Sequence, residues 1–78
     1  IECWKTALSL NAPSGFVLSR QKLKTLKPKR DFGEVKNGGY LIKRRENATV
    51  TIIATGSEVM PSLMAGCHLE NEGINANI

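Results

Sequence analysis

The clearest structural signal in the chain is the run Thr-Val-Thr-Ile-Ile-Ala-Thr at residues 49–55, which is followed at once by Gly56. Isoleucine, valine and threonine are branched at Cβ and pack well on a pleated surface, so a run of them favours a strand. A nearly continuous apolar run of this kind is typical of a central strand in an α/β sheet. Gly56 then allows a tight turn.

A helix is predicted directly after this strand, from Glu58 to about Glu72. Ser57 is expected to cap its start, and Gly73 is expected to end it. Pro61 lacks a backbone N–H, which predicts a distorted or later first turn. His68 falls away from the apolar face and is expected to be solvated. The apolar face comprises Val59, Met60, Leu63, Met64 and Cys67.

Weaker patterns complete the order of elements. Residues 2–10 place apolar side chains at helical spacing, and the apolar stretch at residues 15–19 predicts a short core strand. A turn at residues 37–39 precedes a predicted strand over Tyr40–Lys43, and residues 74–78 begin another strand. The chain is therefore expected to be α/β, with partial three-layer units whose strands are flanked by helices. We expect it to be an excerpt of a longer polypeptide, truncated at both ends.

Composition narrows the class of protein. The chain has 78 residues, of which 41% are hydrophobic and 23% charged, an ordinary globular balance. No apolar run is long enough to cross a bilayer, so a soluble protein is expected. Cys3 and Cys67 lie far apart and His68 is the single histidine, so no metal site is expected. So few cysteines favour the reducing cytoplasm.

A basic run follows the predicted strand at residues 15–19, and the net charge of the chain is +4. Lysine and arginine bind phosphates by displacing counterions, which raises nucleic acid as a partner. Because no aromatic residue interleaves with these charges, a solvated linker is the favoured interpretation. A non-catalytic basic module that binds an acidic partner or nucleic acid remains the alternative. The basic residues are Arg20, Lys22, Lys24, Lys27, Lys29 and Arg30.

Two features could bind an anion. The turn Ala-Thr-Gly-Ser-Glu-Val at residues 54–59 presents N–H groups at the start of a helix, but it has one glycine and no following lysine, which favours a plain strand-to-helix turn. Arg20 follows the apolar stretch at residues 15–19, so it is expected at the rim of a sheet. There it is either an ordinary exposed arginine or a bidentate fork for a phosphate. Spacing alone leaves both interpretations open.

Three blocks occur in a telling order: Gly-Phe-Val-Leu-Ser-Arg-Gln-Lys-Leu at residues 15–23, Gly-Gly-Tyr-Leu-Ile at 38–42 and Ile-Ile-Ala-Thr-Gly-Ser-Glu-Val at 52–59. Together they resemble the transketolase family over essentially the whole chain. The resemblance implies that residues 1–29 are the end of the middle, pyrimidine-binding domain. Residues 30–78 would then be the start of the C-terminal domain.

The resemblance also implies a function. Transketolases are homodimeric enzymes of the pentose phosphate pathway that use thiamine diphosphate and a divalent cation, Mg or Ca. They move a two-carbon glycolaldehyde unit from a ketose phosphate to an aldose phosphate. Arg20 matches the family arginine that binds the substrate phosphate. The family continues this motif with Asn, Leu and Pro, where this chain has Lys22, Leu23 and Lys24.

No catalytic, cofactor-binding or metal-binding residue is assigned to this chain. In the family, the glutamate that activates the cofactor, the diphosphate and metal ligands, and the channel histidines lie in upstream segments. The resemblance therefore implies that the isolated chain is inactive and that catalysis needs the complete enzyme.

Overall fold

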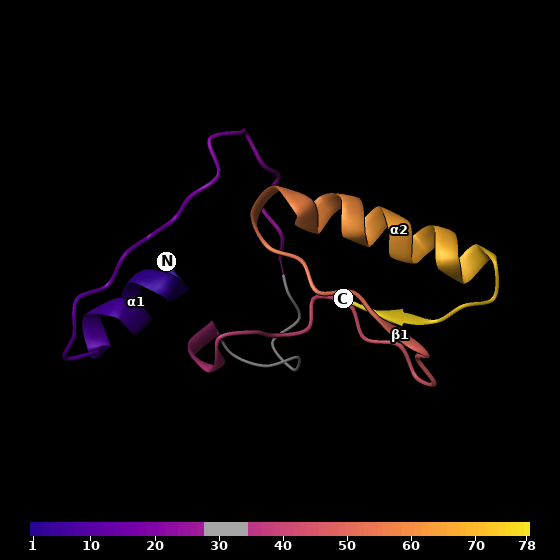
Figure 1. Ribbon diagram of the computed structural model, residues 1–78, viewed down its shortest axis with the longest axis horizontal. Helices are drawn as coiled ribbons and strands as arrows, with labels where there is room; N and C mark the ends of the chain where they lie inside the picture. The colour runs from indigo at the N-terminus through magenta and orange to yellow at the C-terminus, as the bar shows by residue number, and fades with distance from the viewer. Residues whose placement is uncertain (28–34) are drawn as a thin grey trace.

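The computed structural model describes residues 1–27 and 35–78. The molecule is elongated, with principal extents of 45 × 27 × 17 Å. Figure 1 shows helix α1 (Glu2–Ser9) apart from helix α2 (Val59–Asn71), with a long stretch of chain leading from one to the other. Within the described ranges, no helix combines the length and the apolar character needed to span a membrane.

The C-terminal half forms a strand–helix–strand unit. Strand β1 (Val50–Thr51) pairs in parallel with strand β2 (Ala76–Asn77), with Val50 opposite Ala76 and Thr51 opposite Asn77. Helix α2 makes the connection between them, as parallel strands require. The order strand, helix, strand predicted for this half is confirmed, and with it a partial α/β fragment.

The predicted strand over Tyr40–Lys43 is not formed as a strand, but its end joins the sheet. The N–H groups of Ile42 and Lys43 donate to the carbonyl of Ile78 at 2.7 and 3.1 Å, and the Ile78 N–H donates to the Lys43 carbonyl at 3.0 Å. Because β2 and the adjoining Ile78 therefore have backbone partners on both sides, β2 lies between β1 and the segment at residues 42–43. Its Ala76 and the adjoining Ile78 are the buried apolar residues of the described chain.

The strand predicted over residues 49–55 is formed in part, as β1 at one edge of the two-stranded sheet. β1 pairs with β2 on one side, and the N–H groups of Thr49 and Ile52 also donate to the carbonyls of Asn75 and Asn77 at 3.0 and 2.8 Å. Ile53 is 94% exposed. The composition of the run is that of a buried strand, yet its other edge has no neighbour among the described residues. A strand becomes central only when a further segment pairs with it.

Helix α2 begins later than predicted. A 3₁₀ turn, η3 (Gly56–Glu58), precedes it, so Pro61 is its third residue, where an N–H would have no partner within the helix. Ser57 does not cap the helix: its hydroxyl donates to the Glu58 carboxylate at 2.8 Å, and no side chain caps η3 or α2. Gly73 has φ +81° and ends the helix as expected.

The predicted apolar face of α2 is confirmed in part, since Val59, Met60 and Leu63 are half-buried. Gly66 is buried, and a Cβ placed on it would lie 2.6 Å from Cδ1 of Ile78. Met64 and Cys67, which were expected on the apolar face, are exposed. The sheet meets the helix at Gly66, because the missing side chain there leaves room for the side chain of Ile78. His68 is exposed, as predicted.

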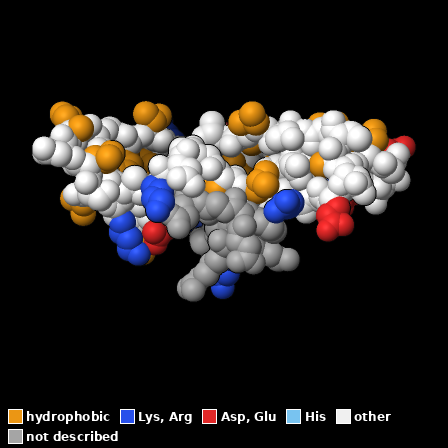
Figure 2. Space-filling view, turned by 90° about the horizontal axis from the view of Figure 1, so that it is seen from below, with side chains coloured by type: hydrophobic (Ala, Val, Ile, Leu, Met, Phe, Trp, Pro, Cys, Tyr) orange, Lys and Arg blue, Asp and Glu red, His pale blue; other side chains and the backbone are white. Residues whose placement is uncertain are grey.

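The N-terminal region contains the predicted helix but lacks the predicted strand. Residues 15–19 form no strand, Val17 is fully exposed, and Leu18 is 79% exposed. Phe16 instead stacks on Trp4 of α1, with ring centroids 4.6 Å apart. A strand needs a hydrogen-bonded neighbour, and no backbone hydrogen bond joins these residues to another described segment. Figure 2 shows hydrophobic side chains reaching the surface toward both ends of the molecule.

The predicted turn after residue 36 is present. A short 3₁₀ helix, η2 (Val35–Asn37), leads into Gly38, whose φ of +84° is the conformation that favours glycine. Part of the predicted basic connection, namely Pro28, Lys29 and Arg30, lies outside the described residues.

Candidate functional site

Arg20 lies in a bend rather than at the end of a strand. Arg20 is exposed, and its side chain forms no ion pair or hydrogen bond with another described residue. The sheet rim that was expected to support it is therefore absent here. The guanidinium keeps its full hydrogen-bonding capacity, since an arginine can donate five N–H groups.

The support near Arg20 comes from the turn between β1 and α2. A Cβ placed on Gly56 would lie 2.9 Å from Oγ of Ser19, the residue that precedes Arg20. The two sequence features that could bind an anion thus meet in space, although 36 positions separate Arg20 from Gly56 in the sequence. Figure 1 shows this part of the long N-terminal stretch passing the start of α2.

The turn itself is poorly suited to bind an anion. The side chain of Glu58 places a carboxylate beside the start of α2, where it accepts the hydrogen bond from Ser57. A negative charge at the N-terminus of a helix stabilises the helix dipole, and it also repels a second anion. The turn therefore acts as an element of structure, and Arg20 is the better candidate for binding a phosphate.

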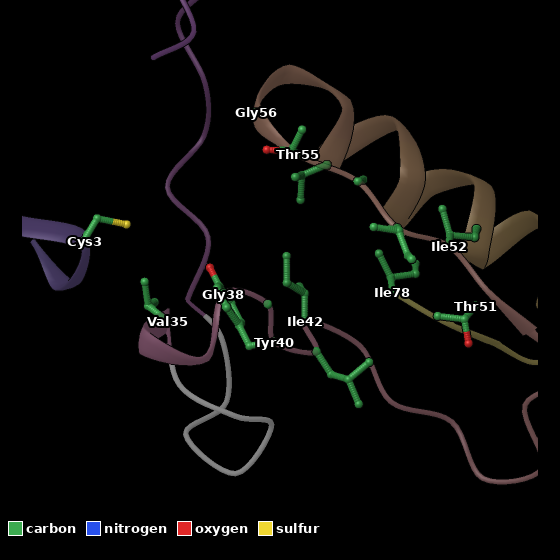
Figure 3. Close-up of a pocket in the computed structure, with 15 residues that line it drawn as sticks. Cys3, Val35, Gly38, Tyr40, Ile42, Thr51, Ile52, Thr55, Gly56 and Ile78 are labelled. Carbon is green, nitrogen blue, oxygen red and sulfur yellow. The ribbon is translucent and has the colours of Figure 1, made fainter. Parts of the chain in front are cut away.

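A large hollow lies between the N-terminal helix and the sheet. Its volume is about 780 Å³. Figure 3 shows Cys3 and Val35 on one side of it and Ile42, Ile52 and Ile78 on the other. None of the described residues that line it carries a charge, and Arg20 is not among them. The hollow is thus a mainly apolar surface that extends to the β1–α2 turn at Thr55 and Gly56.

A cluster of charged residues holds the segment after Gly39 to α2. The Lys43 ammonium lies 2.7 Å from Oε1 of Glu70, and the Arg45 guanidinium binds the same carboxylate as a fork, through Nε to Oε1 and through Nη2 to Oε2 at 3.0 Å. Lys43 also donates to Sγ of Cys67 at 3.6 Å, and the Arg45 N–H donates to Oδ1 of Asn77 at 2.9 Å. Since every cation in this cluster is paired, we interpret it as structural.

These contacts have a consequence for the titration of Glu70. Hydrogen bonds from Arg45 and Lys43, reinforced by their charges, lower the pKa of Glu70 to about 2. A carboxyl with a lowered pKa in the folded state stabilises that state fully above its ordinary pKa of 4.5 and loses this contribution as the pH falls through about 2.

We expect the segment that carries Lys43 and Arg45 to detach from α2 as the pH is lowered from about 4.5 to about 2. Carboxyl carbon NMR should show Glu70 titrating at the lower end of this window, and the amide of Arg45 should lose protection with it. Glu70→Gln should remove the pH dependence and leave the segment detached at neutral pH. Glu72→Gln is the matched control, because Glu72 is exposed and forms no ion pair with a described residue. Titration of Glu70 near 4.5 would contradict the prediction.

Sequence analysis missed this cluster and the contact of Ser19 with Gly56. One signal could have indicated the cluster: Glu70 follows Leu63 and Gly66 at helical spacing, so a carboxylate stands on the face that packs on the sheet. A carboxylate in such a position needs a cation beside it. The contact of Ser19 with Gly56 has no comparable signal, because it joins distant segments through one hydroxyl.

The described residues do not form a site for a metal ion, since no three of their His, Cys, Asp and Glu side chains come together. Both cysteines are free and exposed.

Comparison with known proteins finds transketolases. The chain is 39% identical over 79 residues to the transketolase of Cereibacter sphaeroides, a match that covers 99% of this chain and 12% of the relative. It is 38% identical over 82 residues to the transketolase of Halalkalibacterium halodurans, with 100% and 12% covered, and 36% identical over 78 residues to transketolase 2 of Escherichia coli, with 96% and 12% covered. No protein-family model and no solved structure matches the chain.

Proposed function

Because this chain corresponds over nearly its whole length to a segment of transketolases, we propose that it supplies the substrate-phosphate contact of such an enzyme. The chain spans about an eighth of the length of these relatives, 12% in each case. The proposed enzyme transfers a two-carbon glycolaldehyde unit from a ketose phosphate to an aldose phosphate. Thiamine diphosphate and a divalent cation supply the bond chemistry, and they bind to parts of the enzyme outside this chain.

The proposed role of Arg20 is to bind the phosphate of the sugar. The support is its match to the family motif together with its exposed guanidinium, which has no anionic partner among the described residues. A guanidinium can bind two phosphate oxygens through parallel N–H groups, which orients the substrate as well as attracting it. Arg20 thus selects phosphorylated sugars and takes no part in breaking or forming bonds. Lys22 and Lys24 follow Arg20 and add positive charge that attracts the substrate phosphate toward it.

The proposed domain division places residues 1–29 in the pyrimidine-binding domain and residues 30–78 in the C-terminal domain. No backbone hydrogen bond joins the described residues of these two parts, which supports the division. The boundary itself lies outside the described residues. We further propose that each part completes a three-layer α/β unit within a homodimeric enzyme of the cytoplasm. The exposed apolar residues Val17, Leu18 and Ile53 fit this proposal, because further chain would cover them.

A chimeric enzyme tests the proposed function. The matching segment of the Cereibacter sphaeroides transketolase, over which the alignment runs for 79 residues, is replaced by this chain. We expect the chimera to bind thiamine diphosphate and to transfer the two-carbon unit between phosphorylated sugars. The isolated 78-residue chain is the control and is expected to show no turnover under the same conditions.

Two outcomes would contradict the proposal. The first is a chimera that is folded and dimeric by circular dichroism and sedimentation and yet lacks transferase activity. The second is turnover by the isolated chain with added cofactor and metal, which would refute the dependence on the rest of the enzyme. The alternative of a basic module for nucleic acid is not favoured by the similarity to transketolases.

A further inference from the structure

Gly56 combines two properties that single it out among the glycines of the described chain. Its φ is +57°, in the left-handed region, and a Cβ there would lie 2.9 Å from Oγ of Ser19. Gly38 and Gly73 also have positive φ, but a Cβ on either would meet nothing within 4 Å. Gly56 therefore allows both a turn and the close approach of a second segment, since a Cβ there would be strained at this φ and would require the Ser19 hydroxyl to move.

The segment that carries Arg20 has little other support. Residues 10–27 form neither helix nor strand, and none of their backbone groups bonds to a described residue of the C-terminal half. The residues around Arg20 are exposed. The Ser19 hydroxyl beside Gly56 is thus a contact with the C-terminal half that lies directly next to Arg20.

We propose that Gly56 is a positioning residue for Arg20: by admitting Ser19 against the β1–α2 turn, it sets the point from which Arg20 reaches the sugar phosphate. This inference rests on the proposed phosphate role of Arg20. It also gives a role to a turn that sequence analysis assigned to structure alone. Under the proposed domain division, the contact couples the C-terminal domain to substrate selection.

Misplacement of Arg20 has a specific kinetic signature. An arginine fork loses strength when its geometry is disturbed, because the parallel N–H donors must face both oxygens. The loss appears in binding of the phosphorylated substrate, since Arg20 takes no part in bond chemistry. A general structural role for Gly56 would instead lower kcat and affect phosphorylated and unphosphorylated sugars alike.

The experiment uses the chimeric holoenzyme and compares KM and kcat for a phosphorylated and an unphosphorylated acceptor. Gly56→Ala should raise the KM of the phosphorylated acceptor about three- to tenfold, with kcat and the other KM changed less than about twofold. Gly73→Ala is the matched control: it imposes the same backbone strain in open space and should leave the ratio of the two KM values unchanged.

A double substitution tests the contact itself. In the Ser19→Ala background the hydroxyl is gone, so adding Gly56→Ala should change the KM ratio less than it does alone. If Gly56→Ala lowers the yield of folded enzyme, Ser19→Val crowds the same contact without altering the backbone at residue 56, and it should raise the same KM.

The outcomes separate the two proposals. If Arg20→Ala raises the KM of the phosphorylated acceptor while Gly56→Ala and Ser19→Val do not, the positioning role is refuted and the phosphate role stands. Equal effects of Gly56→Ala and Gly73→Ala, or no coupling with Ser19→Ala, would also overturn the positioning role. If Arg20→Ala changes both acceptors equally, the phosphate role fails, and the positioning role fails with it.

Discussion

Substituting Arg20→Ala in the chimeric enzyme is expected to raise the KM for a phosphorylated sugar about ten- to hundredfold, because hydrogen bonds to a charged group contribute ~1.5 to 3 kcal/mol. The loss should be confined to substrates with a phosphate, since the guanidinium has no other proposed partner. Steady-state kinetics with a phosphorylated acceptor and its unphosphorylated counterpart measure the difference directly.

Two further variants make this measurement decisive. Arg20→Lys keeps the positive charge but loses the planar fork, so it should recover part of the affinity and fall between the wild type and Arg20→Ala. Arg44→Ala is the matched control, because Arg44 is also an exposed arginine of this chain and has no proposed substrate contact. Equal losses for the two classes of sugar, or the same loss from Arg44→Ala, would remove Arg20 from the phosphate site.

The second large effect is expected from Gly66→Leu, which places a bulky side chain between α2 and the end of β2. A Cβ on residue 66 would lie only 2.6 Å from Cδ1 of Ile78. Overpacking of this kind costs about 1 to 3 kcal/mol. Because Ile78 exchanges backbone hydrogen bonds with Ile42 and Lys43, its displacement should also release that segment from the sheet.

Amide hydrogen exchange of the chain measures this second effect. The amides of Ile42, Lys43 and Ile78 should exchange about 5- to 150-fold faster in Gly66→Leu, the range that corresponds to 1 to 3 kcal/mol. Ala65→Leu is the control, since it places the same leucine side chain on the exposed side of α2. The exchange rates of these amides in Gly66→Ala should fall between those in Gly66→Leu and Ala65→Leu, because the flexible end of Ile78 can move away and alanine favours the helix. Unchanged exchange in Gly66→Leu would show that α2 does not pack on Ile78.

Few apolar side chains of the described residues are buried, and many are exposed. Among the described residues, only Ala76 and Ile78 are buried hydrophobics, whereas Val17, Leu18 and Ile53 are mostly or fully exposed. A chain of this length buries only about 60% of the surface of its unfolded state even in a compact domain. Coverage by further chain, as proposed for the complete enzyme, would supply the missing burial.

The sequence by itself determined the strand–helix–strand unit and its turns. The β-branched run at residues 49–55, the positive-φ glycines at residues 56 and 73, and the apolar spacing of α2 are local signals, each recorded within one turn or a few residues. The resemblance to transketolases likewise came from blocks of sequence, and comparison with known proteins confirmed it.

Only the tertiary structure decided which strand lies in the middle, which face of α2 packs, and what supports Arg20. The stretch at residues 15–19 has the composition of a strand, but no described segment pairs with it, and the Ser19 hydroxyl lies beside Gly56 instead. The ion pairs of Glu70 with Lys43 and Arg45 likewise join segments distant in sequence. Composition limits which secondary structure a segment can form. Pairing and packing depend on which distant segment comes within hydrogen-bonding or van der Waals distance.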